Sequence, residues 1–274
     1  MDKEIISNGD VEILLNVLLE KHGYDFTRYS GASVKRRICR LMLLDKFDRL
    51  ADLRDRLIND KEYISRFIQE ITVNVTDMFR DPLFYKTLRE QVLPVLATHP
   101  FIRIWHAGCS TGEEVYSFAI LLKEANLLHK SLLYATDINP EALEKAVKGI
   151  YPLSQMKQFS ENYLLSGGKN DFSEYYTAKY NLAKFDDSLK SKMIVSAHNL
   201  VTDWSFNEFQ LIICRNVLIY FNKELQDKTL ELFDYSLEKL GYLALGSKEQ
   251  IKFSGITPKY KQIDSKEKIW RKMM

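Results

Sequence analysis

Apolar residues recur at helical spacing through the first part of the chain. The stripes are formed by Val11, Leu14, Leu15, Leu18 and Leu19, by Leu50, Leu53 and Leu57, and by Ile64, Phe67, Ile68 and Ile71. Proline, which breaks helices, does not occur before Pro82. The pattern predicts an all-helical domain over residues 1–72.

Beyond about residue 101 the pattern changes to short apolar runs that alternate with helical segments. Strands are predicted at 101–107, 131–137, 192–197, 208–214, 241–246 and 267–272, and helices near 113–126, 140–148 and 223–239. Such alternation is typical of a mostly parallel α/β sheet. We therefore expect an α/β domain over residues 73–274.

Residues 150–190 interrupt this alternation. They hold short polar and aromatic runs around Gly167 and Gly168. Runs of this kind, separated by turn residues, favour hairpins. The segment is predicted to be a small antiparallel β-subdomain inserted into the larger sheet.

Composition excludes several classes of protein. The 274 residues are 46% hydrophobic and 28% charged, and the net charge of +2 gives no electrostatic reason to expect nucleic acid as a partner. No apolar run has the length of a membrane span, and the N-terminus lacks the cationic start and apolar core of a signal peptide. We expect a cytoplasmic protein without membrane insertion.

The cysteines and histidines add no site of their own. Cys39, Cys109 and Cys214 are odd in number and widely spaced, which indicates buried thiols rather than a disulfide framework. The five histidines show no metal-ligand spacing. No metal is expected.

The stretch FIRIWHAGCSTGEEVY, residues 101–116, predicts a strand, a tight turn and a helix. Gly108 and Gly112 allow the backbone to approach a ligand closely. Glu113 and Glu114 would repel a pyrophosphate but would accept a cationic or ammonium group. Alternatively, the two glutamates only stabilise the helix dipole.

A second acid follows the next strand, in the sequence YATDIN. Asp137 can accept hydrogen bonds from both hydroxyls of a ribose, or it can simply begin a turn before the next helix. Because this acid and the glycine turn occur in the order and spacing of a nucleoside site, we favour a nucleoside linked to an amino acid. S-adenosylmethionine fits that description.

Three further segments make the pattern specific. They read TVNVTDMFRDP at 72–82, AHNL at 197–200 and IICRNVLIYF at 212–221. Together with AGCSTGEEVYS and ATDINPEALEKAVKGIY they resemble the CheR family, methyltransferases that modify glutamates of chemoreceptors. The resemblance runs from about residue 10 to residue 272.

The resemblance implies a class I methyltransferase, with a Rossmann-like sheet, an inserted β-subdomain and an N-terminal helical domain. It also implies transfer of a methyl group from S-adenosylmethionine to glutamates of chemoreceptor cytoplasmic helices. The products would be glutamate methyl esters and S-adenosylhomocysteine.

Carried over residue by residue, the resemblance implies a cofactor site that includes Gly108. Asn74, Thr76 and Arg80 would contact the methionine and adenosine parts, and Arg80 would pair with the methionyl carboxylate or else with a neighbouring aspartate. Glu113 would lie near the methionyl ammonium. Asp137 would bind the ribose.

Two later segments complete the implied site. Asn199 and Leu200 would flank the adenine, or else form a turn and part of the core. Arg215 and Asn216 would end a strand at the carboxyl edge of the sheet, or else form a buried structural pair. Tyr220 would line the acceptor pocket or belong to the core.

The sequence departs from the family at one motif. The family often has Gly-His-Ser-Glu after a late strand, where this chain has Gly246-Ser-Lys-Glu249. Any role of that histidine is left unassigned. The 150–190 insertion matches the family's β-subdomain, which in some members docks a receptor tail.

A basic cluster lies on a predicted N-terminal helix. Lys35, Arg36, Arg37 and Arg40 are concentrated there although residues 1–72 hold 13 Lys and Arg against 13 Asp and Glu. The resemblance implies an acidic helical bundle as substrate, and a basic helix would steer it by charge. Alternatively, the cluster is a solvated helix face.

No catalytic acid or base is predicted, because a carboxylate is already ionised near neutral pH. Rate enhancement would come from alignment and exclusion of water. Two other functions are compatible with parts of the pattern: a nicotinamide-dependent dehydrogenase, which Glu113 and Glu114 disfavour, and a non-enzymatic cofactor sensor. A monomer is expected, although nothing in the sequence sets the oligomeric state.

Overall fold

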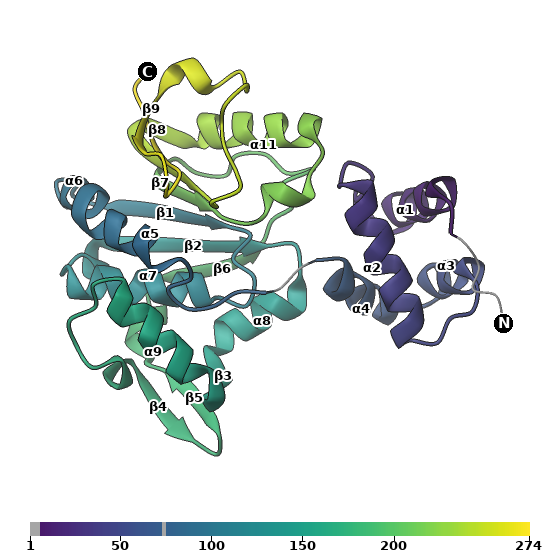
Figure 1. The fold of residues 1–274 in the computed structure, drawn as a ribbon, viewed down its shortest axis with the longest axis horizontal. Helices are drawn as coiled ribbons and strands as arrows, with labels where there is room; N and C mark the ends of the chain where they lie inside the picture. The colour runs from purple at the N-terminus through teal and green to yellow at the C-terminus, as the bar shows by residue number, and fades with distance from the viewer. Residues whose placement is uncertain (1–5, 73–74) are drawn as a thin grey trace. The chain divides into compact units, whose positions relative to one another are not determined.

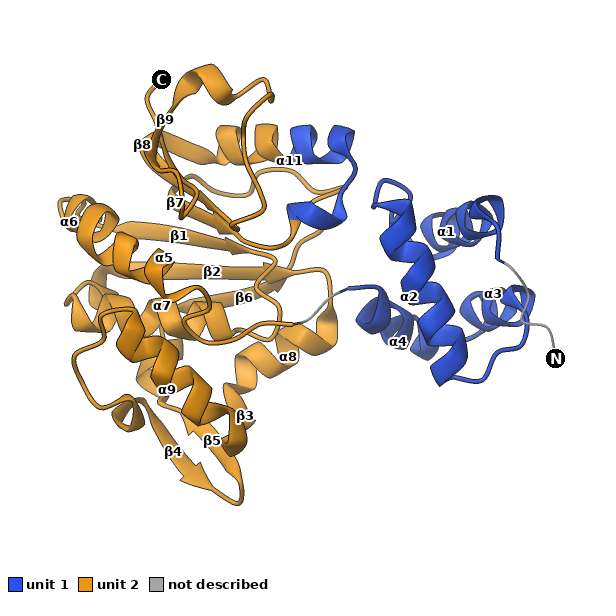
Figure 2. Cartoon of the chain, viewed as in Figure 1, with its two compact units in different colours: residues 1–73, 218–229 blue, residues 74–217, 230–274 orange. Residues whose placement is uncertain are grey.

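The computed structural model describes residues 6–72 and 75–274, and Figure 1 shows their fold. The chain divides into two compact units (Figure 2). The first contains residues 1–73 and 218–229, and the second contains residues 74–217 and 230–274. Within the described ranges, no helix is long and apolar enough to cross a membrane.

The first unit is built on four helices, α1 (Asn8–His22), α2 (Gly31–Leu44), α3 (Leu50–Asn59) and α4 (Lys61–Ile71). Helix α1 begins with a capping box between Ser7 and Asp10 and ends at Gly23, whose φ of 75° suits a glycine C-cap. The predicted apolar stripes form the core, except that Leu19 is 36% exposed.

Residues 218–229 join this unit through the loop between α1 and α2. The Ser30 N–H donates to the Tyr220 carbonyl at 2.7 Å, and Asn222 donates to Arg28 at 2.9 Å. The rings of Tyr29 and Phe221 meet edge to face, with centroids 5.0 Å apart. The segment includes the start of helix α11 (Lys223–Ser236), which continues into the second unit.

The second unit contains a seven-stranded sheet with the order β6-β2-β1-β7-β8-β10-β9. Its strands are β1 (Ile102–Ala107), β2 (Ser131–Asp137), β6 (Met193–Ala197), β7 (Phe209–Cys214), β8 (Leu237–Leu245), β9 (Tyr260–Asp264) and β10 (Ile269–Lys272). Strand β10 pairs antiparallel with both β8 and β9, and the pairs among β6, β2, β1, β7 and β8 are parallel. This arrangement confirms the Rossmann-like fold.

The helices of the sheet layer are α5 (Pro82–Thr87), α6 (Leu93–Leu96), α7 (Glu113–Glu124), α8 (Pro140–Lys148) and α10 (Asp187–Lys190), with a π-helical turn at Leu88–Val92 between α5 and α6. The predicted strands and helices all occur, with small shifts at their ends. Strand β9 was not predicted, because its sequence YKQID holds few apolar residues.

The predicted insertion is a three-stranded antiparallel sheet with the order β3-β5-β4, together with helix α9 (Met156–Leu165). Its strands are β3 (Ile150–Pro152), β4 (Tyr176–Lys179) and β5 (Leu182–Phe185). Tyr180 and Asn181 both have positive φ, as the two central residues of a type I′ hairpin turn require. Figure 1 shows this subdomain at the end of the unit away from β8 and β9.

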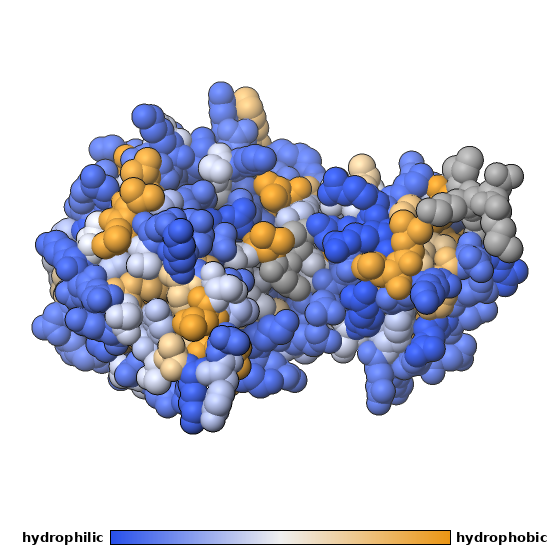
Figure 3. Space-filling model, turned by 60° about the horizontal axis from the view of Figure 1, so that its bottom comes forward, coloured by the Kyte–Doolittle hydropathy of each residue, from blue (hydrophilic) through white to orange (hydrophobic). Residues whose placement is uncertain are grey.

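Apolar side chains fill the space between the large sheet and its helices. Trp105, Tyr116 and Phe118 are fully buried there. The exposed apolar residues include Leu164, Leu165 and others that are scattered along the chain. The face drawn in Figure 3 is accordingly mostly hydrophilic, with small separate apolar patches.

Candidate cofactor site

The turn after β1 lies at the carboxyl edge of the parallel strands, where ligands of open α/β sheets bind. Gly108, Ser110 and Gly112 all have positive φ. A Cβ on Gly108 would lie 2.4 Å from Cγ2 of Val217, and a Cβ on Gly112 would lie 2.8 Å from that of Ala146. The two glycines therefore allow other parts of the chain to pack against the turn.

Asp137 ties this turn to the end of β2. Its Oδ2 accepts the N–H of Ser110 at 2.8 Å, and its Oδ1 accepts the N–H of Asn139 at 2.9 Å. The side chain is buried, and burial raises its pKa against the opposing effect of these bonds. A carboxylate has about four acceptor sites, so capacity remains for hydroxyl donors of a ribose.

Glu113 begins helix α7 and is only 5% exposed. The hydroxyl of Thr111 donates to its carboxylate, at 2.6 Å to Oε2 and 2.8 Å to Oε1. Burial raises its pKa to about 7, although the Thr111 bond opposes this change. An ammonium group bound beside Glu113 would restore its charge.

Glu114, the next residue, is used inside the protein. Its Oε1 lies 2.9 Å from Nδ1 of His106, and its Oε2 lies 3.5 Å from Nη1 of Arg215. Burial opposes ionisation, but the hydrogen bond and charges of these partners outweigh it and lower the pKa of Glu114. The two adjacent glutamates therefore have different partners and different environments.

Arg215 holds the segment before α5. Its Nη2 donates to Asp81 at 2.5 Å, its Nη1 donates to the Arg80 carbonyl at 3.2 Å, and its guanidinium lies 4.1 Å from the centroid of the Phe84 ring. The side chain is only 3% exposed. These contacts support the structural alternative for Arg215, and its contact with a cofactor stays a prediction.

The segment that Arg215 holds has strained backbone. Phe79 and Asp81 have φ values of 51° and 58°, in the left-handed region that side chains disfavour. The Phe79 N–H donates to the hydroxyl of Ser117 at 2.9 Å. Between them, Arg80 donates from Nη1 to the carbonyl of Val75 at 2.9 Å. Within the described ranges it forms no ion pair with an aspartate, so its charge stays available to a ligand.

The loop after β6 lies beside Asp137, whose carbonyl accepts the N–H of His198 at 3.2 Å. The Oδ1 of Asn199 accepts the N–H of Val201 at 3.0 Å, and the Asn199 N–H donates to Asp203 at 2.8 Å. This is the predicted turn. Because the amide oxygen of Asn199 already accepts the Val201 N–H, the amide NH₂ is the group that can bind an adenine edge. Leu200 is buried.

Asn216 follows β7 in a left-handed conformation, with φ of 61°. Its N–H and that of Val217 donate to the carboxylate of Glu249, at 3.0 and 2.9 Å. Glu249 was not among the predicted site residues. The sequence signal that could have found it is the final glutamate of the Gly246-Ser-Lys-Glu249 motif.

Three predicted residues have no described contact with this arrangement. Asn74 lies outside the described residues. Thr76 is half-buried and forms no hydrogen bond with any other described residue. Tyr220 belongs to the first unit, where the guanidinium of Arg37 lies 6.0 Å from its ring centroid. The site roles of these residues stay predictions.

The basic cluster lies on α2 as predicted, but its members differ. Arg40 pairs with the buried Glu70 at 3.1 Å, and Arg37 donates to the Glu70 carbonyl at 3.0 Å. Lys35 lies 3.5 Å from the side-chain oxygen of Asn8. Arg36 is exposed and makes no ion pair with another described residue. Arg37 and Arg40 thus help to hold the helical unit together.

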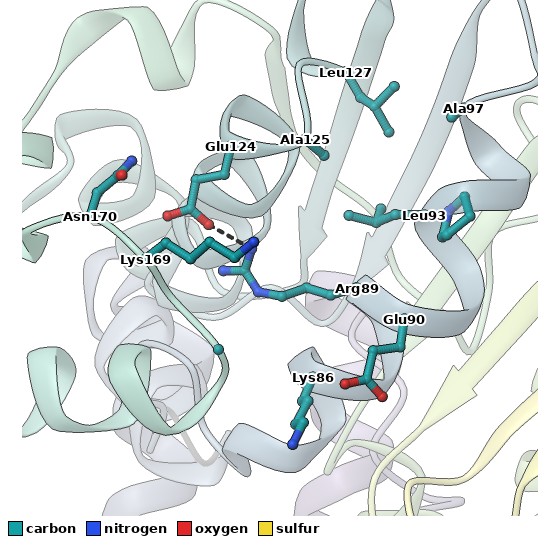
Figure 4. A pocket seen from close by; sticks show the side chains of 12 residues that line it. Lys86, Arg89, Glu90, Leu93, Ala97, Glu124, Ala125, Leu127, Lys169 and Asn170 are labelled. Atoms are coloured by element: carbon teal, nitrogen blue, oxygen red, sulfur yellow. Dashed lines mark ion pairs between the residues drawn. The ribbon is translucent and has the colours of Figure 1, made fainter.

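A cavity of about 650 Å³ lies elsewhere in the second unit. It is lined by Leu93, Glu124 and Leu127 among others, at the edge where β1 and β2 begin. Figure 4 shows the ion pair across it between Arg89 and Glu124, which are 2.6 Å apart. Its lining includes no predicted site residue, so the cavity does not mark the cofactor site.

Comparison with known proteins agrees with this geometry. The family model of the CheR methyltransferase all-alpha domain matches residues 9–72, and that of the CheR methyltransferase SAM binding domain matches residues 74–269. The chain belongs to the CheR methyltransferase family. The resemblance seen in the sequence is thereby confirmed, and the protein is a methyltransferase whose cofactor is S-adenosylmethionine.

Curated relatives cover most of this CheR-family chain. It is 48% identical over 269 residues to a putative methyltransferase Cher3 of Pseudomonas putida, covering 97% of this chain and 98% of that protein. It is 34% identical to a chemotaxis protein methyltransferase of Listeria monocytogenes, covering 84% of this chain and 85% of that protein. It is 32% identical to a chemotaxis protein methyltransferase of Salmonella typhimurium, covering 77% of this chain and 72% of that protein.

The arrangement fits S-adenosylmethionine. Asp137 keeps acceptor capacity at the end of β2, and the buried Glu113 lies at the turn with a pKa near neutrality. Both groups suit the ribose and the ammonium of this cofactor. Arg80, which lacks an acidic partner among the described residues, suits its carboxylate.

Proposed function

We propose that this chain methylates glutamate side chains of chemoreceptor cytoplasmic helices, forming glutamate methyl esters and S-adenosylhomocysteine. Its membership of the CheR family carries the proposal. Two of the relatives compared above are chemotaxis protein methyltransferases by name. Such receptor helices lie in the cytoplasm, and we propose that the enzyme acts there as a monomer.

Bound S-adenosylmethionine would supply a methyl group on an electrophilic sulfonium. We assign its ribose to Asp137, its ammonium to Glu113 and its carboxylate to Arg80. Asn74, Thr76, Gly108, Asn199, Leu200 and Asn216 complete the proposed contacts, and Arg215 supports the segment that carries Arg80. These residues bind and orient.

The proposed chemistry needs no base from the protein. A glutamate carboxylate is ionised near pH 7 and can attack a methyl carbon directly. Attack neutralises two opposite charges, so a site that excludes water favours the transition state. The role of the chain is then to align the carboxylate oxygen, the methyl carbon and the sulfur.

We propose that the helical domain, residues 1–72, docks the receptor and that residues 73–274 bind the cofactor. The receptor helices are acidic, so the exposed Arg36 and its neighbours Lys35, Arg37 and Arg40 would attract them. The internal contacts of Arg37 and Arg40 make Arg36 the cation with the most freedom to do so. Tyr220 is proposed to line the acceptor pocket.

Transfer of radiolabelled methyl from S-adenosylmethionine to a purified receptor cytoplasmic fragment tests the proposal. We expect label in the fragment, and none when its methylatable glutamates are replaced by alanine. A cofactor-sensing protein without enzymatic activity would bind S-adenosylmethionine in a binding assay but label neither fragment.

A further inference from the structure

Glu249 accepts an unusual set of hydrogen bonds for a glutamate side chain. It is 4% exposed, and its carboxylate receives three backbone N–H groups. Its Oε2 accepts from Asn216 at 3.0 Å and from Gly246 at 2.6 Å, and its Oε1 accepts from Val217 at 2.9 Å. One carboxylate thus joins the loops that follow β7 and β8.

The chemistry of these loops explains why an anion is present. Asn216 is left-handed, and its N–H and the next N–H point to the same carboxylate. Successive N–H groups in such a turn form a concave anion-binding nest. Without an acceptor, these half-buried donors would lose their hydrogen-bond partner. Glu249 therefore stabilises a backbone conformation that few residues adopt.

Close packing carries this constraint to the turn after β1. Cγ2 of Val217 occupies the place of a side chain on Gly108, since a Cβ there would lie 2.4 Å away. A Cβ on Gly246 would lie 2.8 Å from both the Asn216 nitrogen and Oε2 of Glu249. The carboxylate of Glu249 thus joins the loops after β7 and β8 by hydrogen bonds, and Val217 packs the β7 loop against the turn after β1.

We propose that Glu249 is a positioning residue for cofactor binding. It fixes the Asn216–Val217 turn and, through Val217, the backbone at Gly108, and it acts through these residues rather than by touching the cofactor. The inference rests on the proposed assignment of Asn216 and Gly108 to the cofactor site.

This role also accounts for the departure from the family's Gly-His-Ser-Glu motif. Ser247 and Lys248, the middle residues, are exposed, whereas Gly246 and Glu249 are buried. The contacts described above use only these two buried ends. The motif can therefore lose its histidine without losing the turn.

The test compares Glu249→Gln with a matched control. Glutamine has nearly the same shape but only one acceptor oxygen, so its NH₂ faces a backbone N–H and at least one bond is lost. Asp234→Asn is the control, since Asp234 is also buried and accepts from Lys259 at 2.5 Å and Tyr260 at 3.0 Å. Its partners lie near the C-terminal strands and not at the cofactor turn.

The readouts are the dissociation constant for S-adenosylmethionine by calorimetry and the melting temperature of the unliganded protein. We expect Glu249→Gln to weaken cofactor binding about tenfold, the effect of one lost hydrogen bond to a charged group. Asp234→Asn should lower the melting temperature but leave cofactor affinity unchanged. Equal cofactor affinity in Glu249→Gln and the wild type would overturn the proposal.

Gly246→Ala gives a second approach if Glu249→Gln folds poorly. Its added Cβ would lie 2.8 Å from both the Asn216 nitrogen and Oε2 of Glu249, so it should displace the carboxylate and also weaken cofactor binding. Because both substitutions act on the same turn, their combined effect on affinity should be less than additive. Gly246→Ala that binds the cofactor like wild type would contradict the inference. Asn216→Ala separates this inference from the proposed cofactor site. If Asn216→Ala leaves cofactor affinity unchanged, the assignment of Asn216 to the cofactor fails. If Asn216→Ala weakens binding but Glu249→Gln and Gly246→Ala do not, the positioning role of Glu249 fails.

Discussion

Oδ2 of Asp137 accepts the backbone N–H of Ser110 at 2.8 Å, so the acid at the end of β2 organises the turn after β1. The same carboxylate accepts the N–H of Asn139 at the start of the next turn. Asp137 is thus a structural acceptor as well as the proposed ligand of the ribose. The two roles are separable by experiment.

Asp137→Asn should weaken cofactor binding at least about tenfold, since a charge-assisted hydrogen bond contributes roughly 1.5–3 kcal/mol. Because the amide keeps only one acceptor oxygen, one backbone N–H also loses its partner, and the unliganded protein should become less stable by about 1–3 kcal/mol. Calorimetry and thermal denaturation measure the two effects. A loss of stability without a loss of affinity would show that Asp137 serves only the turn.

Cofactor binding should release a proton from Glu113. Burial raises its pKa to about 7, and a bound ammonium group would lower it again. At pH 6 the enthalpy of binding should therefore depend on the ionisation enthalpy of the buffer, and Glu113→Gln should remove that dependence. A buffer-independent enthalpy in the wild type at pH 6 would contradict the assignment.

Stability should depend on pH through the same residue. The folded protein holds the Glu113 proton more tightly than the unfolded chain, whose ordinary value is 4.5. The unliganded protein therefore loses stability, by on the order of 3 kcal/mol, as the pH rises from below 4.5 through 7. Glu113→Gln should flatten this part of the profile, as measured by urea unfolding between pH 4 and 8. Parallel profiles of stability against pH for the wild type and Glu113→Gln would refute the raised pKa of Glu113.

The neighbouring residue should behave differently. Glu114 pairs with His106 and with the buried Arg215, and in Glu114→Gln the guanidinium of Arg215 keeps Asp81 as its other acidic partner. Loss of a hydrogen bond to a charged group costs about 1.5–3 kcal/mol, and this loss should appear in urea unfolding at pH 7. Glu113→Gln is the matched control and should not destabilise the protein at that pH. Equal losses in both variants would contradict the different roles.

Arg36 should affect the receptor and not the cofactor. Arg36→Glu is expected to reduce the specificity constant for a receptor fragment at low salt, while S-adenosylmethionine affinity and melting temperature stay unchanged. Added salt should shrink the difference, since screening acts over about 8 Å at physiological ionic strength. Lys61→Glu, an exposed charge reversal on another helix of the same unit, is the control. An unchanged specificity constant at low salt would make the cluster a solvated helix face.

The sequence allowed much of the fold to be predicted, because apolar periodicity reports which faces are buried. The runs at 131–137 and 208–214 became β2 and β7, buried strands of the large sheet. Strand β9 was missed because edge strands such as YKQID need little apolar surface. Leu19 fitted the apolar stripe of α1, but it lies at the edge of the stripe and is 36% exposed.

The site was less accessible to prediction, because residue type does not reveal which contacts a side chain makes. The glycine turn alone does not distinguish Glu113 from Glu114. The family resemblance selects Glu113, and the positions of Thr111, His106 and Arg215 show how the two environments differ. Glu249 ends the Gly246-Ser-Lys-Glu249 motif, but the motif does not reveal its contacts, since they include backbone N–H groups more than 30 residues away.

The chemical nature of the transferred methyl group tests the central claim most directly. A receptor cytoplasmic fragment labelled by this protein with radiolabelled S-adenosylmethionine is treated with dilute alkali, which hydrolyses carboxylate esters but leaves N-methyl and ether linkages intact. If the product is a glutamate methyl ester, the label should leave the fragment as volatile methanol. Label that stays on the fragment after alkali would contradict the account.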